Sequence, residues 1–267
     1  MHRKETNSIA VASKESKKVM NIFLVVLAVL FVGATAFSKF NPFEMLATQG
    51  EFWRFITQDF FPPKFKNWGA LWDSIIETIA MAVGATGVSA VLAILLAFLG
   101  SSSICRLKGI NYVVRMVASI LRNIPALVWA FILVAAFGIG TETGVIALCV
   151  STVGFLTRSF IETLEEVAGE NMEALKSTGA GILPVISQSI LPAALPGFIA
   201  WFLYCIETNI RASTILGMVG AGGIGLLMNG YIKQYNYNAA STVIIVVAVI
   251  IIGVNILTEY LRKITLK

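Results

Sequence analysis

The chain has 267 residues, of which 57% are hydrophobic and only 13% are charged, and its formal net charge is +5. Soluble proteins carry about 25% charged residues, so composition indicates an integral membrane protein rather than a water-soluble globule. Membrane proteins keep lysine and arginine on their cytoplasmic side, which explains the basic excess without nucleic-acid binding. Three widely spaced cysteines and a single histidine, His2, argue against a disulfide framework and a metal site.

The long apolar runs predict membrane-spanning helices. Backbone polar groups inside lipid must hydrogen-bond within the protein, which leaves helices or closed barrels. The runs are continuous and do not alternate between apolar and polar residues, as barrel strands do. We therefore predict an all-α integral membrane protein with six transmembrane helices.

The first predicted span, residues 19–37, follows a polar tail at 1–18 and contains no charge. At about 1.5 Å per residue, a helix of this length crosses a bilayer core of about 30 Å. A cleaved signal peptide is the alternative, because Ala34-Thr35-Ala36 resembles a cleavage site. Signal-peptide cores are usually about 7–15 residues long, so the longer run favours an uncleaved anchor.

Residues 38–71 mix aromatic side chains with charges and include Pro62-Pro63. Aromatic rings beside charged groups suit the interface between water and lipid. We expect one or two short helices here, lying on the outer membrane surface. Docking of a partner outside the cell is the alternative use of this segment.

Five further spans are predicted within residues 72–261, and a basic tail follows at 262–267. They cover residues 75–100, 122–138, 143–160, 193–216 and 239–261. If the amino terminus lies in the cytoplasm, most of the 20 lysines and arginines lie on the cytoplasmic side. Both termini and the connection at 162–192 are therefore predicted to be cytoplasmic.

That connection contains the stretch EALKSTGAGILPVISQSILP, residues 173–192, which is too polar to cross a membrane. Pro184, Pro192 and Pro196 are expected to break any long helix, and Gly179 and Gly181 permit tight turns. We predict short helices at an angle to the membrane, which can fit into a cytoplasmic partner as levers.

The stretch resembles the cytoplasmic loop of ABC importer permeases, whose pattern begins with EAA and ends with LP. The residues that match its spacing are Glu173, Ala174, Gly179, Leu191 and Pro192, while Leu175 and Ser189 depart from it. The resemblance implies that this loop forms a coupling helix, which docks on a separate ATPase and transmits ATP-driven closure. The departures affect docking detail but retain the turn and the LP ending.

Three further stretches within residues 72–261 resemble the phosphonate (PhnE-type) branch of these permeases: IETIAMAVGATGVSAVLAILLAFLG, ILRNIPALVWAFILVAAFGIG and YCIETNIRASTILGMVGAGGIG. The resemblance implies a type I importer permease fold in the bacterial cytoplasmic membrane and import by alternating access. Its implied partners are a second copy of this chain, two cytoplasmic ATPase subunits and an extracytoplasmic solute-binding protein. ATP and Mg²⁺ would be used by the ATPase, with no cofactor, metal or catalytic residue in this chain.

Two alternatives to phosphonate import stay open. Phosphite, hypophosphite or another small oxyanion would suit the same machinery, because specificity rests largely with the binding protein. A channel or an intramembrane enzyme would belong to another class. The sequence contains no P-loop and no HExxH motif or paired nucleophile and base, and a channel would not need the loop.

A glycine cluster matches the GxGxxG pattern at Gly220, Gly222, Gly223 and Gly225. A dinucleotide site requires a strand before this pattern and a helix after it, whereas here a membrane span precedes it. We predict instead a flexible turn where backbones approach closely, which is suited to a gate or a re-entrant loop.

Charged residues inside the spans suggest the substrate pathway. Glu207 and Arg211 are four residues apart on one helix face and can neutralise each other, or Arg211 can attract an anionic substrate near the outer mouth. Asn209 points away from that face. Arg122, three residues before Pro125, either reaches lipid phosphates or contributes to a cytoplasmic gate.

A stripe of mostly small residues predicts tight helix packing in the second span, with lining of the pathway as the alternative. Its members recur every four residues: Met81, Ala85, Ser89, Ala93 and Ala97. Glu77, at the outer end of this span, is expected to be solvated.

Overall fold

The computed structural model describes residues 14–38, 41–176 and 181–265. Every regular element in those ranges is helical, which confirms the predicted all-α class. The chain divides into two compact units, Met1–Gln58 and Asp59–Lys267.

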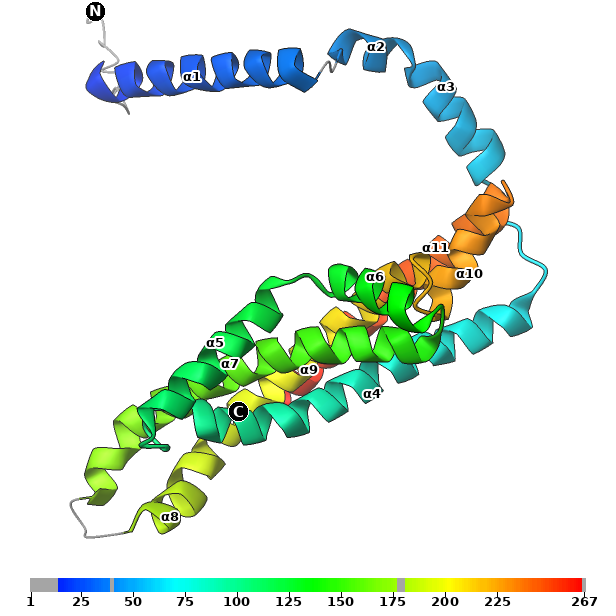
Figure 1. The fold of residues 1–267 in the computed structure, drawn as a ribbon. Helices are drawn as coiled ribbons and strands as arrows, with labels where there is room; N and C mark the ends of the chain where they lie inside the picture. The colour runs from blue at the N-terminus through cyan, green and yellow to red at the C-terminus, as the bar shows by residue number, and fades with distance from the viewer. Residues whose placement is uncertain (1–13, 39–40, 177–180, 266–267) are drawn as a thin grey trace, which may run out of the picture. The chain divides into compact units, whose positions relative to one another are not determined.

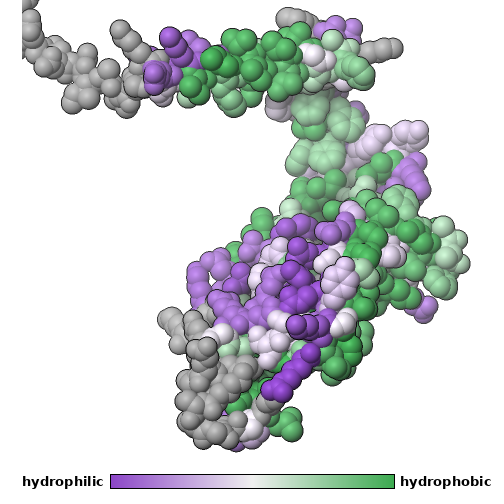
Figure 2. All heavy atoms as spheres, turned by 60° about the vertical axis from the view of Figure 1, so that its left-hand side comes forward, coloured by the Kyte–Doolittle hydropathy of each residue, from purple (hydrophilic) through white to green (hydrophobic). Residues whose placement is uncertain are grey.

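The first unit contains α1 (Lys14–Ser38), an apolar helix without a buried residue among those described. Its stretch Glu15–Ser38 is long and apolar enough to cross a membrane, and Figure 2 shows its largely hydrophobic surface. Two short helices, α2 (Pro42–Ala47) and α3 (Gln49–Arg54), and the π-helical turn η1 (Phe55–Phe60) follow. Short helices were expected in this segment, and their place at a membrane surface stays a prediction.

Four long helices form the framework of the second unit: α4 (Trp68–Gly100), α7 (Thr141–Lys176), α9 (Leu191–Met218) and α11 (Tyr237–Thr265). Helices α4, α7 and α9 pack side by side (Figure 1). The shorter elements are α5 (Lys108–Asn123), α6 (Ala126–Phe137), α8 (Ile182–Val185), η2 (Ile186–Ile190) and α10 (Gly223–Lys233). The predicted spans 75–100, 143–160, 193–216 and 239–261 all lie within the long helices.

The predicted span 122–138 is wrong as a single helix. Arg122 lies in the last turn of α5, Ile124 is extended, and α6 starts at Ala126 and has only 12 residues. Proline disfavours the helical conformation in the residue before it and lacks the backbone N–H, so the helix breaks at Pro125. Helices α5 and α6 are bent by 85°, and the described chain has six candidate spans only if this bent pair counts as one.

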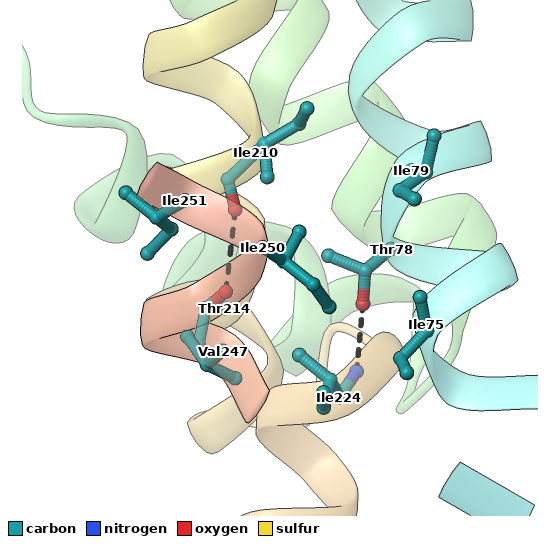
Figure 3. Close-up of a pocket in the computed structure, with 9 residues that line it drawn as sticks. All are labelled: Ile75, Thr78, Ile79, Ile210, Thr214, Ile224, Val247, Ile250 and Ile251. Carbon is teal, nitrogen blue, oxygen red and sulfur yellow. Dashed lines mark hydrogen bonds between the residues drawn. The ribbon is translucent and has the colours of Figure 1, made fainter. Parts of the chain in front are cut away.

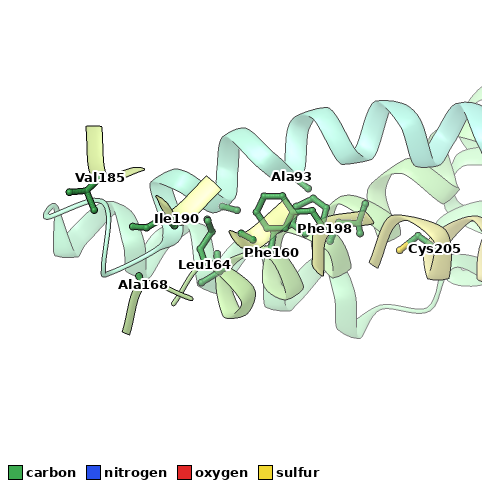
Figure 4. Close-up of a cluster of buried hydrophobic side chains, with 12 residues drawn as sticks. Ala93, Phe160, Leu164, Ala168, Val185, Ile190, Phe198 and Cys205 are labelled. Atoms are coloured by element: carbon green, nitrogen blue, oxygen red, sulfur yellow. The ribbon is translucent and has the colours of Figure 1, made fainter. Parts of the chain in front are cut away.

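The stripe of small residues on α4 is buried, as packing requires. Met81, Ala85, Ser89, Ala93 and Ala97 are at most 1% exposed, and α4 lies along α7. Figure 4 shows the apolar cluster where α4, α7 and α9 meet, with the rings of Phe160 and Phe198 4.3 Å apart between centroids. Small side chains on α4 let the larger side chains of its neighbours approach closely.

A buried polar contact also joins these three helices. The Asn209 side-chain amide of α9 donates to the hydroxyl oxygens of Thr86 on α4, at 2.8 Å, and Thr152 on α7, at 2.9 Å. Asn209 is 6% exposed, so it points into the bundle, as its position relative to Glu207 and Arg211 predicted. Interhelical hydrogen bonds of this kind fix the depth of one helix against another.

Candidate functional site

The segment that was predicted to dock a partner, residues 162–192, consists of two helical arms in its described parts, 162–176 and 181–192. We call this segment the coupling hairpin, after its predicted role. Its first arm is the end of α7, which runs unbroken to Lys176 and carries Glu173 and Ala174. The expected separate short helices before Gly179 are therefore wrong. No proline lies within α7, so the backbone hydrogen bonds continue beyond the apolar stretch. Gly179 lies outside the described residues.

The second arm of the coupling hairpin begins with α8 and continues through η2 into α9 without a gap. Pro184, Pro192 and Pro196 were expected to break any long helix, and this expectation is wrong. Pro192 and its neighbour Leu191 lie in the first turn of α9, where the missing N–H is tolerated, directly after the wider π-helical turn.

Apolar contacts hold the two arms of the coupling hairpin together. Val185 and Ile190 from the second arm pack in one buried cluster with Leu164 and Ala168 of α7 (Figure 4). In contrast, Leu183 is 79% exposed. The hairpin is therefore well packed internally, and it presents an apolar side chain to its surroundings.

The glycine cluster forms the buried turn between α9 and α10. Gly220, Gly222 and Gly223 have φ angles of +102°, +82° and +68°, which favour glycine strongly. Gly225 packs so closely on α9 that a Cβ atom would lie 1.9 Å from the Thr214 carbonyl oxygen. These glycines thus have a structural role, and their use as a gate stays a prediction.

The glycine turn is fastened to neighbouring helices. The Thr78 hydroxyl of α4 accepts a hydrogen bond from the Ile224 backbone N–H at 2.8 Å, as Figure 3 shows. Glu77 accepts from the Thr141 hydroxyl and lies beside Gly222, so the expectation that Glu77 is merely solvated is wrong. The cavity in Figure 3, of about 10 Å³, is too small for a substrate.

Glu207 and Arg211 of α9 form an ion pair with an N–O distance of 2.9 Å. The Glu207 side chain is 15% exposed and the Arg211 side chain 50% exposed. This geometry fits mutual neutralisation, one of the two predicted uses. Contact of Arg211 with a substrate stays a prediction.

Arg122 contributes to a different and polar environment. It lines a cavity of about 160 Å³ together with residues of α7 and α9: Ser151, Thr152, Phe155, Tyr204, Cys205, Thr208 and Asn209. Sequence reasoning singled out Arg122 but missed the hydroxyl groups around it. No short-range spacing connects positions 122, 151 and 208, because only the packing of three helices brings them together.

Residues 89–265, which include these helices, match a family model described as "Binding-protein-dependent transport system inner membrane component". The chain belongs to this family. Membership makes it a multi-pass permease component of a transport system rather than an enzyme, located in the inner membrane.

This permease has relatives with named transport roles. It is 33% identical to the phosphate-import permease protein PhnE of Mycolicibacterium smegmatis over 79% of this chain and 40% of that protein. It is 32% identical to the phosphite transport system permease protein PtxC of Stutzerimonas stutzeri over 76% of this chain and 74% of that protein. The chain thus spans less than half the length of the mycobacterial relative.

Solved permease structures share the fold. The inward-facing MetNI methionine ABC transporter matches with a TM-score of 0.64 and 24% identity, covering 73% of this chain and 95% of that chain. A bacterial ABC transporter that imports alginate matches with a TM-score of 0.58 and 14% identity, over 94% and 99% of the two chains. The permease therefore has the type I ABC importer permease fold.

Proposed function

We propose that this permease forms the pathway of an ATP-driven importer for small phosphorus oxyanions, with phosphonates as the first candidate and phosphite, phosphate or hypophosphite as close alternatives. A symmetric homodimer would enclose the pathway. Two ATPase subunits would bind on the cytoplasmic side and use ATP and Mg²⁺, and a solute-binding protein would deliver the substrate outside. The transport roles named for the two relatives support the class of substrate.

The coupling hairpin is the observation that carries the ATP-driven mechanism. Its first arm is the continuation of α7, and its second arm leads directly into α9. A movement imposed on the hairpin would therefore reach both helices, because the Val185 and Ile190 contacts join its arms. Alternating access then requires only that these helices tilt relative to α4 and α11.

Transport by the reconstituted complex tests this function. The permease is placed in proteoliposomes with a candidate ATPase and a candidate solute-binding protein, and uptake of radiolabelled phosphite and phosphonate is measured with and without ATP. We expect ATP-dependent uptake that either oxyanion inhibits and sulfate does not. Uptake that needs no ATP would indicate a channel, and ATP-dependent uptake of an unrelated solute would overturn the substrate class.

A further inference from the structure

The Arg122 residue is exposed, while its backbone packs closely against α7. Its backbone nitrogen is 2.7 Å from the place where a Cβ atom on Gly154 would lie, so α5 touches α7 there. Gly154 is about 20 Å along the axis of α7 from Thr141, and the apolar stretch Thr141–Gly169 extends about 42 Å. Arg122 therefore lies near the middle of the apolar stretch, at neither end.

The guanidinium of Arg122 has no acidic partner in the described part of the chain. Other arginines of this unit pair with glutamates: Arg115 with Glu165, Arg158 with Glu162, and Arg211 with Glu207. None of the described residues around the Arg122 cavity is acidic. An unpaired cation at membrane depth is costly and suggests a functional role; here its counter-charge would come from a ligand.

Hydroxyl groups in the same cavity are free to bind that ligand. Many threonines of this bundle donate to a carbonyl one turn earlier, as Thr78 and Thr86 do. Ser151 and Thr208 form no such bond within the described ranges. Thr152 and Asn209, which also line the cavity, are hydrogen-bonded to each other, and Tyr204 contributes a phenol to the lining.

We propose that the cavity between α5, α7 and α9 is an oxyanion subsite of the pathway, in which Arg122 binds the anion against the hydroxyls of Ser151 and Thr208. This inference rests on the proposed function and names a binding site for it. Guanidinium and hydroxyl donors suit the oxygens of a phosphoryl group. A space of about 160 Å³ equals roughly five water molecules, which admits a small, partly hydrated oxyanion.

A larger cavity of about 480 Å³ does not compete for this role. It is lined by Glu77, Ser74, Tyr231 and Gln234, among others, and none of its lining residues is basic. The Glu77 carboxylate would repel an oxyanion there. The cavity lined by Arg122 therefore suits an anionic substrate better than the larger cavity lined by Glu77.

Binding of inorganic phosphate to the intact complex tests the subsite. Equilibrium dialysis of radiolabelled phosphate at millimolar concentrations is compared for the parent, Arg122→Gln and Arg122→Lys. The control is Arg106→Gln, which removes another exposed arginine, between α4 and α5, that does not line the cavity. We expect Arg122→Gln to weaken binding roughly tenfold or more, because charge-assisted hydrogen bonds are lost. Arg122→Lys should retain part of the affinity, and Arg106→Gln should bind as the parent does.

A second variant separates the hydroxyls from the charge. Ser151→Ala combined with Thr208→Val leaves Arg122 in place and should weaken phosphate binding several-fold, with ATPase association unchanged. The subsite is disproved if the parent binds no phosphate, or if Arg122→Gln binds as tightly as the parent. The proposed function fails on a different result, which is that the parent complex shows no ATP-dependent oxyanion uptake.

A lipid headgroup offers the same phosphate chemistry and is distinguished by native mass spectrometry of the purified complex. If Arg122 holds a lipid, the parent retains a phospholipid that Arg122→Gln loses, and added phosphate does not displace it. That outcome overturns the assignment to a free oxyanion. Absence of such a lipid, with phosphate binding that depends on Arg122, supports it.

Discussion

Two glycines of α10 have very different surroundings. At Gly225 a Cβ atom would lie 1.9 Å from the Thr214 carbonyl oxygen, whereas at Gly230 nothing lies within 4 Å. A backbone oxygen cannot move aside as a flexible side chain can. The close contact between α9 and α10 therefore depends on one residue without a side chain.

We expect Gly225→Ala to destabilise the permease and Gly230→Ala to leave it unchanged or slightly more stable. Alanine is favoured over glycine within a helix by up to about 1 kcal/mol, so only the clash separates the two variants. Thermal unfolding of the purified protein in detergent measures the difference. Equal unfolding temperatures would mean that α10 does not pack on α9 as described.

The Glu207–Arg211 pair can be tested by removing both charges. Arg211→Gln alone leaves the Glu207 carboxylate, which is 15% exposed, without its partner, and we expect this to lower stability. We expect Glu207→Gln combined with Arg211→Gln to restore stability and uptake toward those of the parent. A double variant as impaired in uptake as Arg211→Gln, yet stably folded, would instead assign Arg211 a direct contact with substrate.

The helices of the second unit show which parts of the fold can be predicted from patterns in the sequence. Uninterrupted apolar length predicted four long helices, and four-residue spacing predicted the buried stripe on α4. Helix α5 was missed because its polar and apolar residues alternate around the helix, so average hydropathy made it resemble a connection. In the coupling hairpin, the prolines suggested helix breaks, whereas the structure accommodates them with a π-helical turn that continues into α9.

The coupling hairpin contains a matched pair of apolar residues. Ile190 is fully buried against α7, and Leu183 is 79% exposed. We expect Ile190→Ala to lower stability by about 2–5 kcal/mol and to uncouple ATP hydrolysis from uptake. Leu183→Ala should keep the stability of the parent but weaken association with the ATPase.

Size-exclusion chromatography of the permease with its ATPase measures the second effect. Ile256→Ala is the control, because Ile256 is 64% exposed on α11, away from the coupling hairpin. Association that survives Leu183→Ala and is lost with Ile256→Ala would move the ATPase contact away from the hairpin.

At the scale of the whole molecule, the ATP-driven mechanism depends on the side of the membrane that the coupling hairpin faces. Charge distribution in the sequence predicts the cytoplasm. The cavity around Arg122 could not be predicted from the sequence, because its residues come from three helices far apart in sequence. In contrast, the counts of lysine and arginine in the sequence predict the orientation in the membrane, and helix packing alone carries no information about it.

Single-cysteine labelling decides the orientation. With Cys105, Cys149 and Cys205 replaced by serine, Gly181→Cys places a thiol on the coupling hairpin and Lys233→Cys places one at the end of α10, both at exposed positions. A membrane-impermeant maleimide should label position 181 only in inverted vesicles and position 233 only in right-side-out vesicles. Because each thiol is labelled in one type of vesicle, each shows that the reagent reaches the exposed face of those vesicles, and so serves as the control for the other. Labelling of position 181 from outside would separate the coupling hairpin from any cytoplasmic ATPase and would exclude ATP-driven import through it.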